Sequence, residues 1–312
     1  MIAAIAKRIL IWAVTIVVAT LLIFLVLEIL PGDIAQVLLG QEARPDTVAA
    51  LRESLGLNLP AHVRYFDWIG GLVVGDMGTS YTYNVPVGTL IAERLSITIP
   101  LTLASIAASI VIALVLGIYS AVHHNRIGDY AVMALSQAGI AVPGFWLGLL
   151  LIVLFSVNLG WFPASGFPGW HSGMAEASYA LVLPVVALSA AQAGVLTRVI
   201  RSSVLDVLSE DFVRTAKAKG LSGLGALYRH ALRNAMIPVV TIMGLQFAHG
   251  LVGAIVIENV FSLPGLGSLL FQAINQRDLI VVKNVVVVLA ILIISINFLI
   301  DLLYLAIDPR LR

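Results

Sequence analysis

The chain has 312 residues, of which 60% are hydrophobic and 11% are charged, and its mean hydropathy is +1.02. Soluble domains are about 45–50% apolar and about 25% charged, so this composition excludes an ordinary soluble protein and indicates a membrane protein. The net charge of +1 gives no sign of nucleic-acid binding, and the lack of cysteine excludes disulfides and cysteine-ligated metals.

Six apolar runs predict an all-α polytopic membrane protein with six transmembrane helices. The first run follows Lys7 and Arg8 and is longer than the apolar core of a secretory signal, so we expect a retained helix. Pro143-Gly144 predicts a kink or break within the third run, and Pro238 is expected to mark the re-entry into the membrane. The runs lie at residues 9–30, 97–122, 130–157, 179–200, 236–257 and 284–307.

The distribution of basic residues predicts that both termini are cytoplasmic. Six spans place the two ends on one side, and this orientation puts twelve of the eighteen basic residues inside. Four of the remaining six lie in the long first loop, where the positive-inside rule is weak. The twelve are Lys7, Arg8, Arg126, Arg198, Arg201, Arg214, Lys217, Lys219, Arg229, Arg233, Arg310 and Arg312.

The first extracytoplasmic loop is unusually long and carries aromatic residues that it can bury. We expect short helices at residues 46–55 and 62–73, the second ended by Gly75, and then extended chain with a turn at residues 78–86. The third outside loop, residues 258–283, should contain a short helix after Pro264-Gly265.

The chain therefore divides into three parts. Residues 1–30 form an N-terminal transmembrane helix, and residues 31–96 form the extracytoplasmic loop region. Residues 97–312 form a core of five transmembrane helices, which contains a cytoplasmic segment at residues 201–235.

Charged residues concentrate in one cytoplasmic interval, residues 198–233, which holds ten of the thirty-five charged residues. Ser209 is a good N-cap, acidic residues follow it, and Gly220 predicts a helix end, so residues 210–219 should form a short helix. Ser222 can start another helix, which carries an apolar stripe on one face and Arg229 and Arg233 on the other.

A solvated connecting loop is the simplest interpretation of this interval. The sharp helix ends and the small residues Ala216, Ala218 and Gly220 favour a different one, in which the segment enters a groove on a soluble partner. His123 and His124 lie in a short inside turn and are expected to be solvated.

The sequence of this interval resembles the permease subunits of binding-protein-dependent ABC importers, and among them the oligopeptide, dipeptide and nickel group. The matching letters are DFVRTAKAKGLS at residues 211–222, RHALRNA at residues 229–235 and IP at residues 237–238. The wider family has Glu-Ala-Ala, three residues and then glycine. Here Arg214-Thr215 replace Glu-Ala while Ala216 and Gly220 are kept, a departure that the peptide group shares.

Further matches extend the resemblance over nearly the whole chain. They are LPGD at 30–33, GDMGTS at 75–80, ERL at 93–95, FWLG at 145–148, LGWFPASG at 159–166, ENVF at 258–261, PGLG at 264–267, DLLY at 301–304 and DPR at 308–310.

The resemblance implies a type I ABC importer permease fold, with this chain as the first of two membrane subunits in a bacterial inner membrane. It also implies a second homologous permease, two cytoplasmic ABC ATPases and an extracytoplasmic solute-binding protein. The cargo implied is a di- or oligopeptide, while nickel chelates, glutathione and sugar-derived ligands stay open. The coupling residues would be Asp211, Arg214, Thr215, Ala216, Lys217, Lys219, Gly220, Leu221 and Ser222.

This chain is expected to have no catalytic residues, metal site or bound cofactor of its own. No GxxxxGK[ST] or HExxH motif occurs, so it lacks the P-loop and that zinc-protease site. ATP and Mg are expected on the partner ATPases. A stand-alone ion-coupled transporter or intramembrane enzyme is disfavoured because Glu28, Glu258 and Asp301 all lie near span ends.

Polar residues in or near the spans are the remaining candidates, since burial in lipid is costly unless they face a cavity or a neighbour. We expect Asp301 to pair with an arginine of another helix, and Thr98, Thr102, Ser105 and Ser109 to join helices. Candidate path residues are Gln192, Gln246 and His249. Candidates for an outer gate or binding-protein contact are Gly78, Tyr81, Glu258, Phe261, Pro264 and Gly265.

Overall fold

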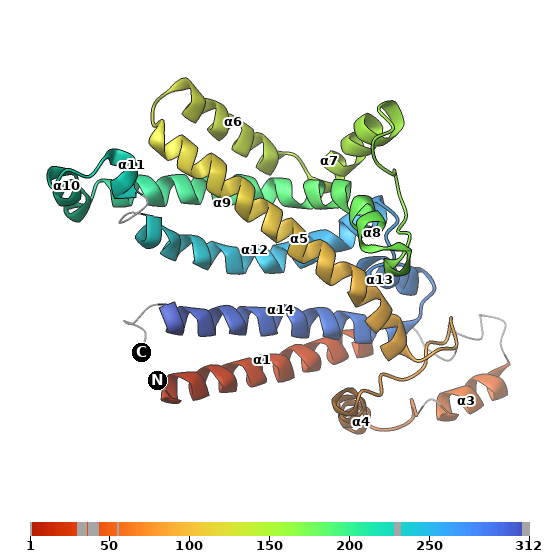
Figure 1. Cartoon of the computed structure of the whole chain (residues 1–312). Helices are drawn as coiled ribbons and strands as arrows, with labels where there is room; N and C mark the ends of the chain where they lie inside the picture. The colour runs from red at the N-terminus through yellow and green to blue at the C-terminus, as the bar shows by residue number, and fades with distance from the viewer. Residues whose placement is uncertain (1, 30–35, 37–43, 55, 228–231, 308–312) are drawn as a thin grey trace. The chain divides into compact units, whose positions relative to one another are not determined.

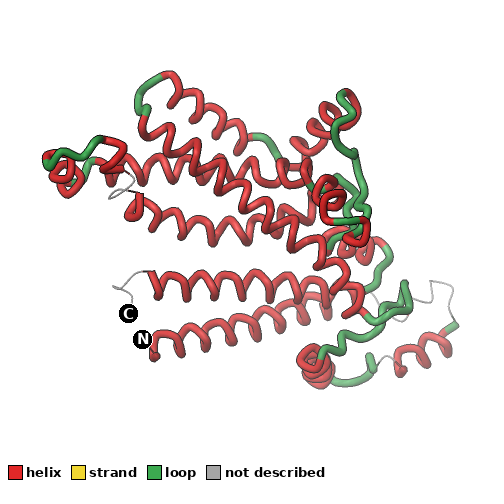
Figure 2. The backbone as a smooth tube through the Cα atoms, viewed as in Figure 1, coloured by secondary structure: helices red, strands yellow, loops and turns green. Residues whose placement is uncertain are grey.

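The computed structural model describes residues 2–29, 36, 44–54, 56–227 and 232–307. Within these ranges the regular structure is helical (Figures 1 and 2), apart from one isolated β-bridge between Thr79 and Pro86. The predicted all-α fold class is confirmed. The chain forms two compact units, Met1–Ser96 with Gly265–Arg312 and, second, Ile97–Pro264. The sequence-based division at residues 30 and 96 stays a prediction.

Short helices in the first unit follow the expectations for the two outside loops. Gly75 ends α4 with a φ of 83°, the left-handed conformation that glycine adopts readily. α5 begins at residue 87 rather than 97, because Glu93 and Arg94 lower the hydropathy without opposing helix formation. The unit contains α1 (Ile2–Ile29), α3 (Pro45–Ser54), α4 (Ala61–Val74), the first residues of α5 (Val87–Val122), α13 (Leu266–Asn275) and α14 (Leu279–Ile307).

Two long apolar helices of this unit, α1 and α14, run side by side (Figure 1). The Trp12 ring packs 5.7 Å from the ring of Phe298, centroid to centroid. Arg8 Nη1 lies 2.6 Å from Asp301 Oδ2, which confirms the predicted arginine partner of Asp301. The pairing lowers the cost of placing both charges within apolar helices.

The second unit is organised around α9, the most buried of its membrane-spanning helices, which packs against α6, α7 and α12. One apolar cluster joins α9 to α5 and α12, and another joins it to α12 and to the region after α7. The unit contains the rest of α5, α6 (Ile127–Ala141), α7 (Gly144–Leu151), η1 (Ile152–Asn158), η2 (Trp170–Ser172), α8 (Met174–Ala180), α9 (Val182–Leu208), α10 (Asp211–Ala218), α11 (Gly223–Ala226) and α12 (Leu232–Val260).

The predicted break at Pro143-Gly144 is confirmed. α6 ends at Ala141, α7 begins at Gly144, and the two apolar segments are bent by 102°. In the part of the chain that the structure describes, five helices are long and apolar enough to cross a membrane, and the bent pair brings the number to six if it counts as one span. α12 begins at Leu232 and carries Pro238 within it, and the expectation that Pro238 marks the re-entry into the membrane stays a prediction.

Glycine permits the closest approach between α6 and α9. A Cβ atom added to Gly194 would lie 2.5 Å from the carbonyl oxygen of Ser136, which no real Cβ tolerates. Because that oxygen belongs to the backbone, it cannot move without shifting α6.

We therefore expect Gly194→Ala to destabilise the protein by about 1–3 kcal/mol, the usual cost of overpacking. Thermal unfolding of the purified protein in detergent measures the effect. Gly70→Ala is the matched control, since Gly70 is also helical and a Cβ there would meet nothing within 4 Å. Equal melting temperatures for the two variants would contradict the close packing of α6 on α9.

The four candidate hydroxyl groups of α5 make two kinds of hydrogen bond, one to another helix and three within α5 itself. Thr98 Oγ1 crosses to α12 and donates to Glu258 Oε1 at 2.5 Å, as a residue joining helices should. Thr102, Ser105 and Ser109 are buried, but each donates to a carbonyl of its own helix. These local bonds satisfy the hydroxyls within α5. The expectation that Thr102, Ser105 and Ser109 join helices stays a prediction.

Candidate functional site

The candidate coupling segment follows directly from α9. α10 covers Asp211–Ala218, close to the predicted helix at residues 210–219. Ser209 is not its N-cap, because its hydroxyl donates to the carbonyl of Asp206 at 2.7 Å and so closes the end of α9. The backbone carbonyl of Glu210 accepts the first hydrogen bonds of α10 instead.

α10 has one face turned toward the protein and one turned outward. Val213 is fully buried and belongs to the apolar cluster that includes the end of α9. Ala216 is also buried, so its small side chain faces inward, whereas the sequence analysis placed it toward a partner. Phe212 is 43% exposed and lies beside the exposed residues Arg214 and Thr215.

Phe212 was missed as a candidate because an aromatic residue in a short helix is more often buried. A single exposed apolar residue is common on protein surfaces, so Phe212 becomes a candidate contact only together with the charged residues beside it and its place in the predicted coupling segment. The outward face of α10 therefore offers an aromatic anchor with a polar rim.

Gly220 produces the turn after α10. Its φ is +93°, and a Cβ placed there would meet nothing within 4 Å, so the glycine is required by backbone conformation and not by space. Leu221 N donates to the carbonyl of Ala216 across the turn, and Ser222 Oγ then accepts from Gly225 N at 3.1 Å at the start of α11.

The rest of the coupling residues stay predictions. Asp211, Lys219 and Ser222 are exposed and Leu221 is half-buried, while the side chain of Lys217 lies outside the described residues. The predicted second helix is described as far as Leu227, and Arg229 and the side chain of Arg233 lie outside the described residues.

The three candidate path residues line one pocket of about 350 Å³ within the second unit. Gln192 comes from α9, and Gln246 and His249 come from α12. Gln246 Nε2 donates to the backbone carbonyl of Gln192 at 3.4 Å, and His249 Nδ1 lies 2.8 Å from the carbonyl of Leu245. The remaining lining is apolar, so the pocket presents neutral polar groups within a hydrophobic wall.

Of the three path candidates, Gln192 has a buried polar atom without a hydrogen-bond partner among the described residues. Its side chain is 5% exposed, and its Oε1 has no hydrogen-bond donor among the described residues. A buried amide oxygen without a donor costs about 1–3 kcal/mol. The assignment of these residues to a path stays a prediction.

The candidate gate residues divide between the two units. Glu258 and Phe261 are almost fully buried in the second unit, and Phe261 O accepts from Gly166 N at 2.9 Å. Pro264 ends that unit and is half-buried. Both roles weighed for these residues, an outer gate and contact with a binding protein, stay predictions.

Gly78 and Tyr81 belong to the turn before α5 in the first unit, and Gly265 precedes α13 in the same unit. The turn is held by Asp278, a fully buried residue that the sequence analysis missed. Ser80 Oγ donates to Asp278 Oδ2 at 2.6 Å and Thr82 N donates to the same oxygen at 3.1 Å. Burial, and then the negative charge of Asp278, raise the pKa of the Tyr81 phenol.

A buried ion pair anchors the α9 end that leads to α10. Arg201 Nε lies 2.6 Å from Asp129 Oδ1, and Arg201 Nη2 lies 2.7 Å from Asp129 Oδ2. Asp129 is 1% exposed and also accepts from the Ser120 hydroxyl and from Asn125 N. The pair therefore fixes the turn between α5 and α6 to α9.

Sequence reasoning missed this pair. Asp129 lies at the start of one apolar run and Arg201 at the end of another. Both were predicted on the same side of the membrane, and their opposite charges were the sequence signal that could have indicated an ion pair. His124, expected to be solvated, contacts both residues, with its Nδ1 2.9 Å from Arg201 Nη2 and 3.3 Å from Asp129 Oδ2.

Within the described residues no three His, Asp or Glu side chains gather as a metal site. The expectation that this chain holds no metal or cofactor stays a prediction.

Comparison with known proteins gives consistent matches over the whole chain. Residues 113–312 match the family described as binding-protein-dependent transport system inner membrane component, and residues 1–102 match its N-terminal family. A glutathione transport system permease protein of Salmonella choleraesuis (strain SC-B67) is 43% identical over 306 residues, covering 98% of this chain and 97% of that protein.

A putative peptide transport system permease protein of Brucella abortus (strain 2308) is 40% identical over 312 residues, covering 100% of this chain and 99% of that protein. The inward-facing MetNI methionine ABC transporter has a similar fold, with a TM-score of 0.58 and 20% identity over 70% of this chain and 96% of that chain. The solved structure supports the predicted type I importer fold. The chain belongs to the family of binding-protein-dependent transport system inner membrane components, the permease subunits of ABC importers.

Proposed function

We propose that this protein is one of two permease subunits of an ATP-driven importer for di- or oligopeptides. A second homologous permease completes the translocation path, two cytoplasmic ABC ATPases bind ATP and Mg, and an extracytoplasmic binding protein delivers the peptide. The protein resides in a bacterial inner membrane with both termini in the cytoplasm, an orientation that the distribution of its basic residues supports.

One observation carries the proposal: α10 is a short helix with an inward apolar face and an outward face around Phe212, followed by the sharp turn at Gly220. Such a surface is suited to the groove of a soluble partner. The chain lacks a P-loop, so the energy of ATP reaches it only through such a contact.

Transmission of movement follows from the way α10 is connected. Val213 packs into the cluster that contains Ile200 and Val204 of α9, so a push on α10 displaces the cytoplasmic end of α9. α9 also carries Gln192 of the polar pocket, and the Asp129–Arg201 pair ties it to the turn between α5 and α6. Closure of the ATPases thereby changes which side of the membrane the path faces, and the binding protein and nucleotide bias the two states by their different affinities for them.

The chemistry of the pocket supports a peptide cargo. Gln192, Gln246 and His249 give the pocket neutral polar groups that suit a peptide backbone, and the apolar lining accepts varied side chains. Two of the relatives above are named as a glutathione transport system permease and a putative peptide transport system permease, and glutathione is itself a tripeptide. Glutathione is thus the second candidate.

The proposal is tested by purifying the tagged protein from its native host in mild detergent. We expect a second permease and ABC ATPases to co-purify, and the associated binding protein to carry a peptide identified by mass spectrometry. Uptake of a labelled dipeptide in the presence of excess glutathione separates the two cargoes. Purification without any ATPase under conditions that preserve membrane complexes would contradict the proposal.

A further inference from the structure

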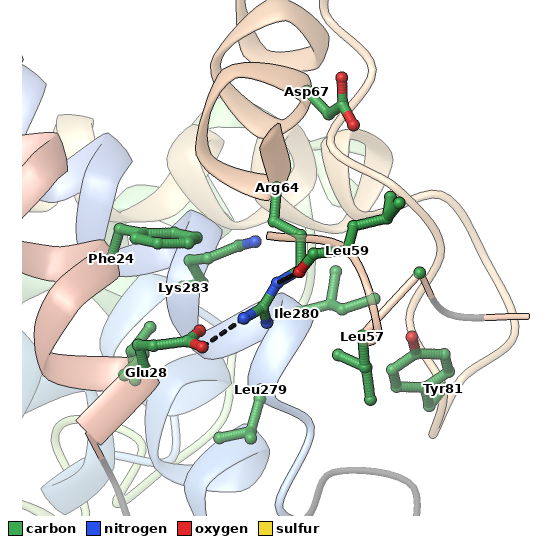
Figure 3. Close-up of a pocket in the computed structure, with 12 residues that line it drawn as sticks. Phe24, Glu28, Leu57, Leu59, Arg64, Asp67, Tyr81, Leu279, Ile280 and Lys283 are labelled. Carbon is green, nitrogen blue, oxygen red and sulfur yellow. Dashed lines mark hydrogen bonds and ion pairs between the residues drawn. The ribbon is translucent and has the colours of Figure 1, made fainter. Parts of the chain in front are cut away.

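A pocket of about 430 Å³ lies within the first unit. The end of α1 and the start of α14 form its floor, α4 forms one wall, and Tyr81 lies at its edge (Figure 3). Its charged residues are Glu28, Arg64, Asp67 and Lys283, and the rest of its lining is largely apolar.

The ammonium of Lys283 is attracted by the more distant Glu28 carboxylate but forms no ion pair with the described residues. Arg64 Nη2 donates to Glu28 Oε1, and Arg64 Nε donates to the carbonyl of Leu59 at 3.1 Å, so these two side chains neutralise each other. Lys283 Nζ lies 4.5 Å from the centre of the Trp68 ring. Among the described residues no carboxylate lies within ion-pair distance of Lys283.

The other described polar groups of the pocket do not form an ion pair with Lys283. Figure 3 shows the carboxylate of Asp67 directed away from the other charged groups of the pocket. The Tyr81 hydroxyl makes no hydrogen bond to the described part of the chain, although it lines the same pocket. The pocket therefore presents an ammonium and a hydroxyl that make no hydrogen bond to the described residues, and both can donate to an oxyanion.

The position of the pocket along the helices places it at the level of lipid headgroups. Glu28 lies one residue before the end of α1, and Lys283 lies in the first turns of α14. Tyr65 of α4 packs 5.5 Å from Phe24 of α1, ring to ring. Tyr and Trp residues that gather at the end of transmembrane helices are typical of the boundary between hydrocarbon and water.

The exposed surface next to the pocket is apolar. On α4, Phe66 and Val73 are 68% and 81% exposed, as expected for a helix that lies in the membrane interface with its apolar side toward lipid. On α1, Val26 and Ile29 are 58% and 77% exposed beside Glu28. An acyl chain could follow this face of α1 while its headgroup entered the pocket.

We propose that this pocket binds the phosphodiester headgroup of an anionic membrane lipid, with the phosphate on Lys283 and the hydroxyl of Tyr81 donating to it. A lipid is favoured over a soluble anion because the pocket opens beside exposed apolar helix surface at the end of two spans. A bound headgroup would join α1, α4 and α14 where Glu28 and Arg64 already link the first two.

The test is native mass spectrometry of the purified importer complex, equilibrated with equal amounts of phosphatidylglycerol and phosphatidylcholine. The wild type should retain phosphatidylglycerol in preference, and Lys283→Gln should lower that preference about tenfold, the value of one charged hydrogen bond. Lys283→Arg should preserve it, and Tyr81→Phe should weaken it. Lys7→Gln, which removes a lysine from the other end of α1, is the matched control and should change nothing.

Two outcomes would overturn the proposal. In one, Lys283→Gln retains the wild-type lipid preference while eluting as an intact complex from gel filtration. In the other, an N-acetyl dipeptide, which carries a free carboxylate, binds with the same dependence on Lys283 while phosphatidylglycerol does not, and the pocket then serves a soluble anion. Because Lys283→Arg keeps the charge, its behaviour separates loss of binding from misfolding.

Discussion

Replacing Gly220 with valine should reduce peptide uptake by about tenfold or more while the protein still inserts into the membrane. The φ of +93° at this residue is strained for any side chain, and a β-branched residue pays about 1–2 kcal/mol or more to adopt it. The turn after α10 would shift to another conformation, and the exposed face around Phe212 would no longer be presented to the ATPase. Uptake of labelled peptide by cells and the amount of co-purified ATPase measure the two effects.

Gly223→Val is the matched control for this experiment. Gly223 lies three residues further along the same segment, has no positive φ, and would place a Cβ in open space. It should therefore leave uptake and ATPase association nearly unchanged. Normal uptake by Gly220→Val would show that the turn does not transmit the ATPase movement.

Arg201→Met should destabilise the protein more than any other single change at the cytoplasmic end of α9. It leaves the Asp129 carboxylate buried without its cation, and breaking a buried pair in this way costs about 3–5 kcal/mol. We expect about 3 kcal/mol, the lower end, because the Arg201 side chain is 22% exposed. Thermal unfolding in detergent gives the measurement.

Two further variants make the interpretation specific. Arg198→Met removes an exposed arginine one turn earlier on α9, whose Nη1 donates to Gln137 Oε1 at 3.2 Å, and should have little effect. The double variant Asp129→Leu with Arg201→Met removes both charges and should recover much of the stability. A double variant as unstable as Arg201→Met alone would mean that the pair matters through packing and not through charge.

The sequence was most informative where one local rule decides the structure. Long apolar runs located the membrane helices, Pro143-Gly144 located the bend, and Gly75 and Gly220 located helix ends, because each depends only on neighbouring residues. The same rule failed for the start of α5, where polar residues continue a helix beyond its apolar run.

Features that depend on distant residues were harder to predict. The pairs Asp129–Arg201 and Ser80–Asp278 join residues that are 72 and 198 positions apart. The sequence around each residue does not indicate which distant residue it contacts. For Asp301 the sequence predicted that an arginine would be the partner, because a charge near the end of a span needs an opposite charge, but it did not indicate which arginine. The direction in which Phe212 and Ala216 point depends on how α10 rests on α9, which a short helix in isolation does not determine.

This permease should move cargo only when a separate ATPase binds and displaces its α10 segment. Reconstitution into liposomes tests it most directly, by comparing peptide accumulation with the complete importer and with the two permeases and binding protein alone. We expect ATP-dependent accumulation of peptide with the complete importer. With the permeases and binding protein alone, accumulation should not exceed that of empty liposomes. Accumulation against a gradient by the permeases without ATPase subunits would contradict it.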